Sequence, residues 1–160
     1  GWFLTAGEPS DNFVILPESF LIVRQPSGVG SRQLTLAGSI PTSTETVFLY
    51  SDNAEKNDNY VSQPLVVDRA LSELEFGSSF VESTGFFPPQ RGDELLYYSM
   101  LGGINPAPTK RFFKFNGDWY DSGEGVIANS FVIPAGSPLI VRKAPTVSGV
   151  TSMWSVQPVQ

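Results

Sequence analysis

Short apolar runs, separated by turn-forming residues, recur along this chain from end to end. The 15 Gly and 13 Pro interrupt it at intervals of roughly eight to twelve residues, which is typical of the strands and turns of all-β domains. The runs between them are rich in β-branched and aromatic residues: "NFVIL", "FLIVR", "RQLTLAG", "ETVFLYS", "PLVVD", "SSFVES", "ELLYYSM", "KRFFKF", "DWYDS", "SFVIP", "PLIVRK" and "TSMWSV". The pattern predicts an all-β fold, an antiparallel sandwich or barrel of about ten to twelve short strands.

Three stretches allow more specific predictions. "RQLTLAG" alternates apolar and polar residues, as a half-exposed strand does, whereas "FLIVR" and "PLIVR" are continuously apolar, which favours strands covered on both faces. In "KFNGDWY", Asn116-Gly117 stands between two aromatic runs and predicts a tight hairpin. Only residues 68–76 have helical spacing, with Val67, Leu71 and Leu74 on one face and Asp68 as N-cap, so we expect at most one short helix there.

Two segments of the chain are near-copies of each other. Phe13–Arg24 and Phe131–Arg142 match at Phe, Val, Ile, Ser, Leu, Ile, Val and Arg, and a Trp precedes each segment. We expect duplicated units of this kind to form equivalent substructures that pack together. The prediction is one all-β domain over residues 1–160, with pseudo-repeats at 2–38 and 119–156 joined by a non-repeated segment at 39–118.

The two copies differ at their beginnings. An aromatic strand and the Asn-Gly turn precede Trp119, whereas a single glycine precedes Trp2. The first copy therefore lacks the leading strand of its twin, and we expect it to present an unpaired β-edge. Such edges are sites for pairing with another chain.

The order of these motifs resembles an uncharacterised family of secreted proteins from verrucomicrobial-type bacteria. The resemblance rests on an aromatic strand, "NG", "DWY", the strand pair "FVIPAGSPLIVRK" and the terminal "WS"; "LTLAGSIPT" and "RGDELLYY" are similar to the family's connecting segments. It extends over nearly the whole chain. It implies a secreted protein whose precursor is longer than these 160 residues, and it assigns neither an activity nor functional residues.

Composition narrows the possible chemistry. The chain has neither Cys nor His, which excludes thiolate catalysis, disulfides, zinc sites of the Cys/His type and imidazole bases. Its ten basic residues are dispersed and its net charge is −6, so non-specific nucleic-acid binding is not expected. Charged residues make up only 16% of the chain, less than in typical globular domains, which fits a surface partly occupied in an assembly. No apolar run is long enough to span a membrane.

Two short motifs are candidate binding sites. The loop "SDNAEKNDN" places oxygen-bearing side chains close together, and these are weak candidates for Ca²⁺ ligands: Asp52, Asn53, Glu55, Asn57 and Asp58. Their spacing differs from that of the EF-hand loop and Lys56 opposes a cation, which favours a solvated polar loop. Arg91-Gly92-Asp93 matches the tripeptide read by integrins, but its neighbours predict an ordinary turn.

Catalysis by paired carboxylates is the remaining enzymatic possibility. Glycoside hydrolysis needs two carboxyl groups at a defined separation, and the sequence supplies acids at the junctions of strands and turns: Glu73, Glu75, Glu82, Asp93, Glu94, Asp118, Asp121 and Glu124. No arrangement of a nucleophile and a base accompanies them. The sequence therefore predicts neither a catalytic residue nor a cofactor.

The aromatic residues of the repeats have two possible roles. Trp2, Phe3, Trp119, Tyr120 and Trp154 are candidates for assembly contacts or for stacking on sugar rings, although burial in the core or between the repeats is the commoner use of such rings. Our first hypothesis is a non-enzymatic structural protein of the bacterial surface that assembles with copies of itself into filaments or lattices through exposed β-edges. The alternative is a carbohydrate-binding or adhesion module that uses surface aromatics, with a glycan as its partner.

Overall fold

The computed structural model describes residues 28, 30, 44–61, 67–99 and 107–156, and these form a structure dominated by antiparallel strands. The strands are β1 (Glu45–Ser51), β2 (Asn57–Val61), β3 (Arg69–Ala70), β4 (Glu94–Tyr97), β5 (Lys110–Phe115), β6 (Asp118–Asp121), β7 (Val132–Ile133), β8 (Leu139–Lys143) and β9 (Val150–Val156). Helical structure among the described residues is limited to the single 3₁₀ turns η1 (Leu71–Glu73), η2 (Gly77–Ser79) and η3 (Pro88–Gln90). The predicted all-β fold is confirmed.

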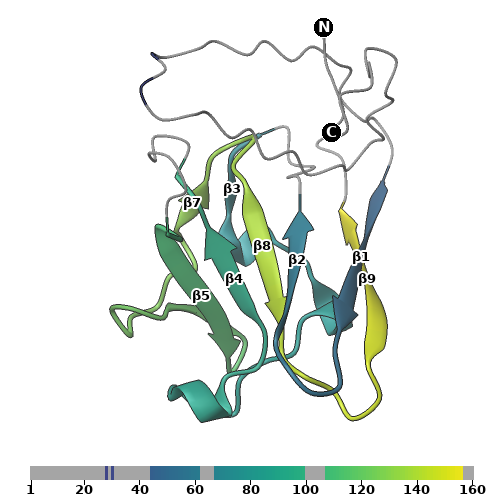
Figure 1. The fold of residues 1–160 in the computed structure, drawn as a ribbon. Helices are drawn as coiled ribbons and strands as arrows, with labels where there is room; N and C mark the ends of the chain where they lie inside the picture. Colours follow the sequence, from purple (N-terminus) through teal and green to yellow (C-terminus); the bar gives the residue numbers. More distant parts are fainter. Residues whose placement is uncertain (1–27, 29, 31–43, 62–66, 100–106, 157–160) are drawn as a thin grey trace, which may run out of the picture.

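The strands form one five-stranded sheet and two smaller ones. The larger sheet has the order β2-β8-β4-β5-β6, while β1 pairs with β9 and β3 pairs with β7. All of these pairs are antiparallel. Figure 1 shows β5, β4, β8 and β2 side by side, with β1 and β9 next to β2. Strands far apart in the sequence are therefore neighbours, as β1 and β9 illustrate.

The core lies on one face of the five-stranded sheet. Leu95, Phe112 and Val141 lie in one register row across the sheet and belong to a single apolar cluster with Trp119 and Trp154. The opposite face of the sheet is also covered in places, since Leu96 and Ile140 are buried there. The prediction that "PLIVR" is covered on both faces is thus confirmed.

The predicted hairpin at Asn116-Gly117 is present. Phe115 pairs with Asp118 at the closing position of β5 and β6. Asn116 has φ 51° and Gly117 has φ 85°, the two positive values that a type I′ turn requires. A glycine and an asparagine are the residues that adopt this backbone most easily, so the sequence signal had a direct steric origin.

Two local predictions were wrong. "SSFVES" is not a strand: its first residues belong to η2, and Phe80 turns into the core. Asp68 is not an N-cap, because its carboxylate accepts a hydrogen bond from the backbone of Ala135 at 2.8 Å. The chain remains extended at β3 and then makes the single turn η1, in which Leu71 is buried. Pairing of β3 with β7 therefore prevailed over the local helical pattern.

The polar loop predicted around residues 52–59 contains a strand that the sequence did not reveal. β2 begins at Asn57 and pairs with β8. Its polar side chains find partners on neighbouring strands, as described below, so a strand forms without an apolar pattern. Nearly all of the first pseudo-repeat, including Trp2, Phe3 and the proposed free edge, lies outside the described residues.

Candidate functional site

A lysine and an aspartate meet inside the core where β4 and β8 run together. Glu94 of β4 lies opposite Arg142 of β8, so the adjoining pair along the ladder is Asp93 and Lys143. Because side chains alternate between faces along a strand, both fall on the core face that Leu95 occupies. Asp93 is 0% and Lys143 is 3% exposed.

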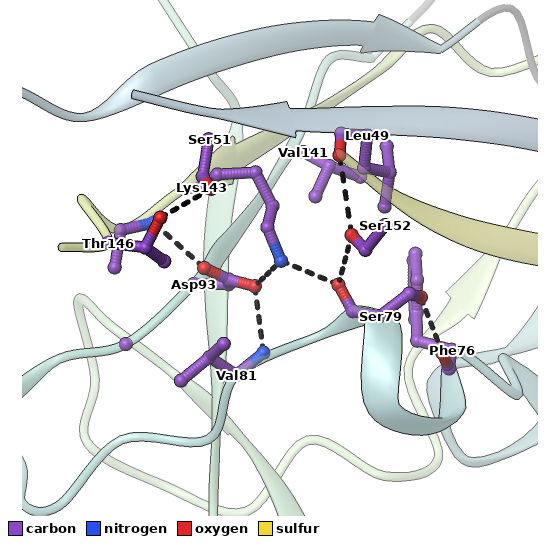
Figure 2. Close-up of polar contacts among 12 residues, drawn as sticks. Leu49, Ser51, Phe76, Ser79, Val81, Asp93, Val141, Lys143, Thr146 and Ser152 are labelled. Atoms are coloured by element: carbon purple, nitrogen blue, oxygen red, sulfur yellow. Dashed lines mark hydrogen bonds and ion pairs between the residues drawn. The ribbon is translucent and has the colours of Figure 1, made fainter. Parts of the chain in front are cut away.

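The two charged groups contact each other and are held by backbone groups (Figure 2). The Nζ of Lys143 donates to Oδ2 of Asp93 and, at 2.5 Å, to the carbonyl oxygen of Ser79. Oδ2 of Asp93 also accepts from the amide of Val81 at 2.7 Å, and Oδ1 accepts from the amide of Ala144 at 2.8 Å. This fourfold contact compensates both charges for the water they lose, which a buried pair needs in order to be tolerated.

The hydroxyl group of Ser152 connects this pair to the β1–β9 sheet. Ser152 of β9 donates to the carbonyl oxygen of Ser79 at 3.3 Å, on the same atom that Lys143 contacts, and to the carbonyl oxygen of Leu49 at 3.3 Å. Figure 2 shows Ser79 between Lys143 and Ser152. The Lys143–Asp93 pair thus joins three parts of the fold: the five-stranded sheet, the segment after η2 and the β1–β9 sheet.

A second group of charges lies on the opposite face of the five-stranded sheet. Glu94 is buried and contacts the Nζ of Lys56 at 2.9 Å and the guanidinium of Arg91 at 3.4 Å. Burial alone raises the pKa of Glu94, but the hydrogen bond and charge of Lys56, followed by the charge of Arg91, outweigh it and hold that pKa below its ordinary value. Beside it, Arg142 makes two hydrogen bonds to the carboxylate of Asp58, at 2.6 and 2.8 Å.

A third charged group, Lys110 and Asp121, joins the start of β5 to the end of β6. Burial raises the pKa of Asp121, but a 2.6 Å hydrogen bond from Lys110 and the backbone amides of Gly123 and Glu124 reverse this effect and leave the pKa lowered. The Lys110 side chain is partly open to water. Glu94 and Asp121 therefore stabilise a strand junction and a turn, and their lowered pKa values are opposite to the raised pKa of a general acid.

Three of the candidate Ca²⁺ ligands, Asp52, Asn57 and Asp58, have hydrogen-bond partners within the protein. Asp58 is turned toward Arg142, as described, and Asp52 accepts from the backbone amide of Ala54 at 2.9 Å. Asn57 contacts the carbonyl oxygen of Tyr50. Among the residues described, no group of three or more His, Cys, Asp or Glu side chains is arranged to hold a metal ion. The side chains of Asn57 and Asp58 therefore join β2 to β1 and β8, and that of Asp52 stabilises its own loop.

The integrin-type tripeptide is not presented as an adhesion loop. Asp93 is fully buried against Lys143. Arg91 is occupied by Glu94 and by the hydroxyl of Ser122 at 2.5 Å, and its guanidinium lies 4.8 Å from the ring centre of Phe113. The tripeptide is a structural junction of the fold.

The tryptophans among the stacking candidates are core residues. Trp119 is 2% and Trp154 is 1% exposed, and the ring of Phe76 stacks on Trp154 at 4.1 Å. Neither indole can present its face to a sugar in this structure, which corrects their proposed use as a binding platform. Tyr120 is half-buried against Phe86 at 4.8 Å between ring centres.

The buried lysine was not predicted, although the sequence contains a signal for it. In "LIVRK", a period of two places Lys143 on the same face as Leu139 and Val141, and a lysine on an apolar face demands a buried acid as its partner. The partner itself, Asp93, was considered only as part of the tripeptide and as a catalytic acid. Their proximity depends on the pairing of β4 with β8, which no local pattern reveals.

Comparisons with protein-family models, with curated proteins and with solved structures gave no match for this chain. No helix within the described ranges is long and apolar enough to cross a membrane.

Proposed function

We propose that this protein is a non-enzymatic structural subunit, located outside the cell, that associates with copies of itself through the outer face of the β1–β9 sheet. One observation carries the proposal. Phe48 and Met153 lie directly opposite each other on that face and are 65% and 64% exposed, and Tyr50 on the same face is 49% exposed. Large side chains grouped in this way on a surface mark sites of association.

The alternation of buried and exposed side chains along β1 and β9 supports this assignment. Val47, Leu49 and Trp154 point into the core, whereas Phe48, Tyr50 and Met153 are large apolar side chains at outward positions. The same outward face also carries the uncharged polar residues Thr46, Thr151 and Ser155. Aromatic residues and Met are also the types enriched at protein interfaces. We call Phe48, Tyr50 and Met153 the patch. A second copy of this chain is its proposed occupant, since the patch carries no charge. The low charge content of 16% also suits a surface partly covered by neighbours.

The described edges of the five-stranded sheet favour a face contact over edge pairing. The backbone of residues 126–128 covers β6, with Ala128 donating to the carbonyl oxygen of Trp119 at 2.7 Å. At the other edge, Asn59 of β2 bonds to the backbone of Tyr50 in β1. A face contact alone, related by a two-fold axis, forms a closed dimer.

Sedimentation velocity over a range of concentrations tests the proposal. In the wild type, the weight-average sedimentation coefficient is expected to rise with concentration, and in a Phe48→Ser/Met153→Ser variant it is expected to remain at the monomer value. Phe87→Ser is the matched control, because Phe87 is 73% exposed and lies next to η3, away from the patch; it should associate like the wild type. A wild type that stays monomeric at the highest concentration, or a double variant that associates equally well, contradicts the proposal.

The carbohydrate-binding alternative loses its tryptophan candidates within the described residues. Trp119 and Trp154 are buried. Exposed rings among the described residues belong to Phe48, Tyr50, Tyr60, Phe86 and Phe87, and Phe48 and Tyr50 share the outer face of the β1–β9 sheet. The same double variant therefore distinguishes the two functions. If a glycan binds the wild type and the monomer state persists throughout, the face serves a sugar rather than a second copy.

A further inference from the structure

We infer that Lys143 and Asp93 are a site of covalent modification: the two side chains condense to an intramolecular amide that cross-links the end of β8 to the residue preceding β4. The inference is independent of self-association. It begins from the placement of an amine and a carboxylate, in direct contact, inside the apolar core of a chain that has no cysteine.

Burial makes the amine a potential nucleophile. A neutral amine held away from water attacks carbonyl carbon. In the proposed step, a proton passes from the Lys143 ammonium to Oδ2 of Asp93 along the hydrogen bond that joins them, which produces a neutral amine beside a neutral carboxylic acid.

The condensation is balanced by the atoms already present. The Nζ lone pair forms a bond to Cγ of Asp93, the bond from Cγ to Oδ2 breaks, and its electron pair leaves with that oxygen. Of the three ammonium protons, one stays on the nitrogen and two leave with Oδ2 as a water molecule. The positive and negative charges cancel, and neither an oxidant nor a cofactor takes part.

Backbone groups occupy the positions this step requires. The amide of Ala144 donates to Oδ1 at 2.8 Å, where negative charge develops when Cγ becomes tetrahedral, so it acts as an oxyanion donor. The amide of Val81 donates to Oδ2 at 2.7 Å and stays available to the departing water. The carbonyl oxygen of Ser79, 2.5 Å from Nζ, accepts the N–H of the product amide.

The restraint on both groups supplies the proximity that makes such a reaction favourable. Lys143 is fixed in β8, and Asp93 is fixed beside β4 by two backbone amides, so the reactants cannot separate without disturbing paired strands. Groups held in reacting geometry gain large effective concentrations. The product links residues 50 positions apart in the chain and takes the place that a disulfide occupies in cysteine-containing domains.

Intact-protein mass spectrometry of the denatured wild type, after incubation in the folded state at neutral pH, tests the inference. We expect a mass lower than that of the sequence by one water molecule, in a fraction that grows with time. Tryptic mapping should then give a branched peptide joining Lys143 to Asp93, with cleavage after Lys143 lost. Lys143→Arg and Asp93→Ala should both show the full sequence mass, a measurement that does not depend on their folding.

The chain contains its own control for this experiment. Lys110 and Asp121 are also in contact, at 2.6 Å, but the Lys110 side chain is partly exposed to water. Lys110→Arg should therefore retain the mass deficit of the wild type. A wild type that keeps its full mass, or a deficit that maps to any pair other than Lys143 and Asp93, overturns the inference.

Discussion

Gly92 precedes the buried Asp93 and lies where there is no room for a side chain of its own. A Cβ atom on Gly92 would lie 2.3 Å from the carbonyl oxygen of Val81 and 2.7 Å from that of Glu82. Both atoms belong to the backbone, so they cannot move aside as a flexible side chain would. The backbone amide of Gly92 also donates a hydrogen bond to the hydroxyl of Ser83 at 3.1 Å. The glycine of the "RGD" sequence is thus explained by close packing of two segments.

The lowered pKa of Glu94 makes the free energy of unfolding depend on pH. A carboxylate whose pKa falls on folding adds stability above its unfolded pKa of about 4.3, and this stability is lost as the pH falls through the lower folded pKa. In Lys56→Met, Arg91 alone opposes the effect of burial, so the pKa of Glu94 rises. We expect Lys56→Met to reduce the free energy of unfolding by about 1 kcal/mol at neutral pH, given the partial exposure of Lys56.

Urea denaturation at a series of pH values measures this effect. The difference between wild type and Lys56→Met should shrink as the pH falls below the ordinary glutamate range, because protonated Glu94 gains nothing from the lysine. Lys114→Met is the control, since Lys114 lies 3.8 Å from the exposed Glu82; its difference from wild type should not follow the same pH dependence. A constant difference for Lys56→Met at all pH values contradicts the assignment.

The junction between β1 and β2 depends on the side chain of one asparagine. Asn59 accepts from the amide of Tyr50 at 2.7 Å and donates to the carbonyl oxygen of the same residue at 2.9 Å. It also contacts the carbonyl oxygen of Val141 at 3.3 Å. An amide side chain here reproduces the two hydrogen bonds of a strand neighbour, and so it joins the β1–β9 sheet to the five-stranded sheet.

Asn59→Ala is expected to lower the free energy of unfolding by about 1–3 kcal/mol, because it removes the hydrogen-bond partner of the Tyr50 amide and the shorter of two hydrogen bonds to the Tyr50 carbonyl oxygen. Hydrogen exchange at the Tyr50 amide should become faster in this variant, while the amides in the centre of β4 keep their protection. Asn57→Ala, which removes a 3.3 Å contact to Tyr50, should have a smaller effect. Unchanged exchange at Tyr50 in Asn59→Ala would show that this side chain does not join the sheets.

The sequence was most informative where a local steric rule operates. The Asn-Gly hairpin and the covered strand "PLIVR" followed directly from residue type and order. β2 escaped prediction because Asp58 and Asn59 are stabilised by Arg142 and Tyr50, which are distant in the chain. The Lys143–Asp93 pair escaped for the same reason: a period of two indicates which face each residue occupies, but not which strands are neighbours.

The described part of the molecule combines buried ion pairs in its interior with an apolar patch on its outer surface. The buried charges of Asp93, Glu94 and Lys143 are paired inside the protein. Phe48, Tyr50 and Met153, by contrast, are exposed on the outer face of the β1–β9 sheet. With a net charge of −6, copies repel one another at low ionic strength. Salt screens this repulsion, and association through an uncharged patch should therefore strengthen as salt is added.

Cross-linking of single-cysteine variants tests the proposed face most directly, because the chain has no cysteine of its own. Thr151→Cys places a thiol on the patch, opposite Tyr50, and Val147→Cys places one on the fully exposed turn before β9. With a short bismaleimide, Thr151→Cys should give covalent dimers in a yield that rises with protein concentration, and added Phe48→Ser should suppress them. Equal yields from the two cysteines, or a yield that Phe48→Ser leaves unchanged, would contradict the account.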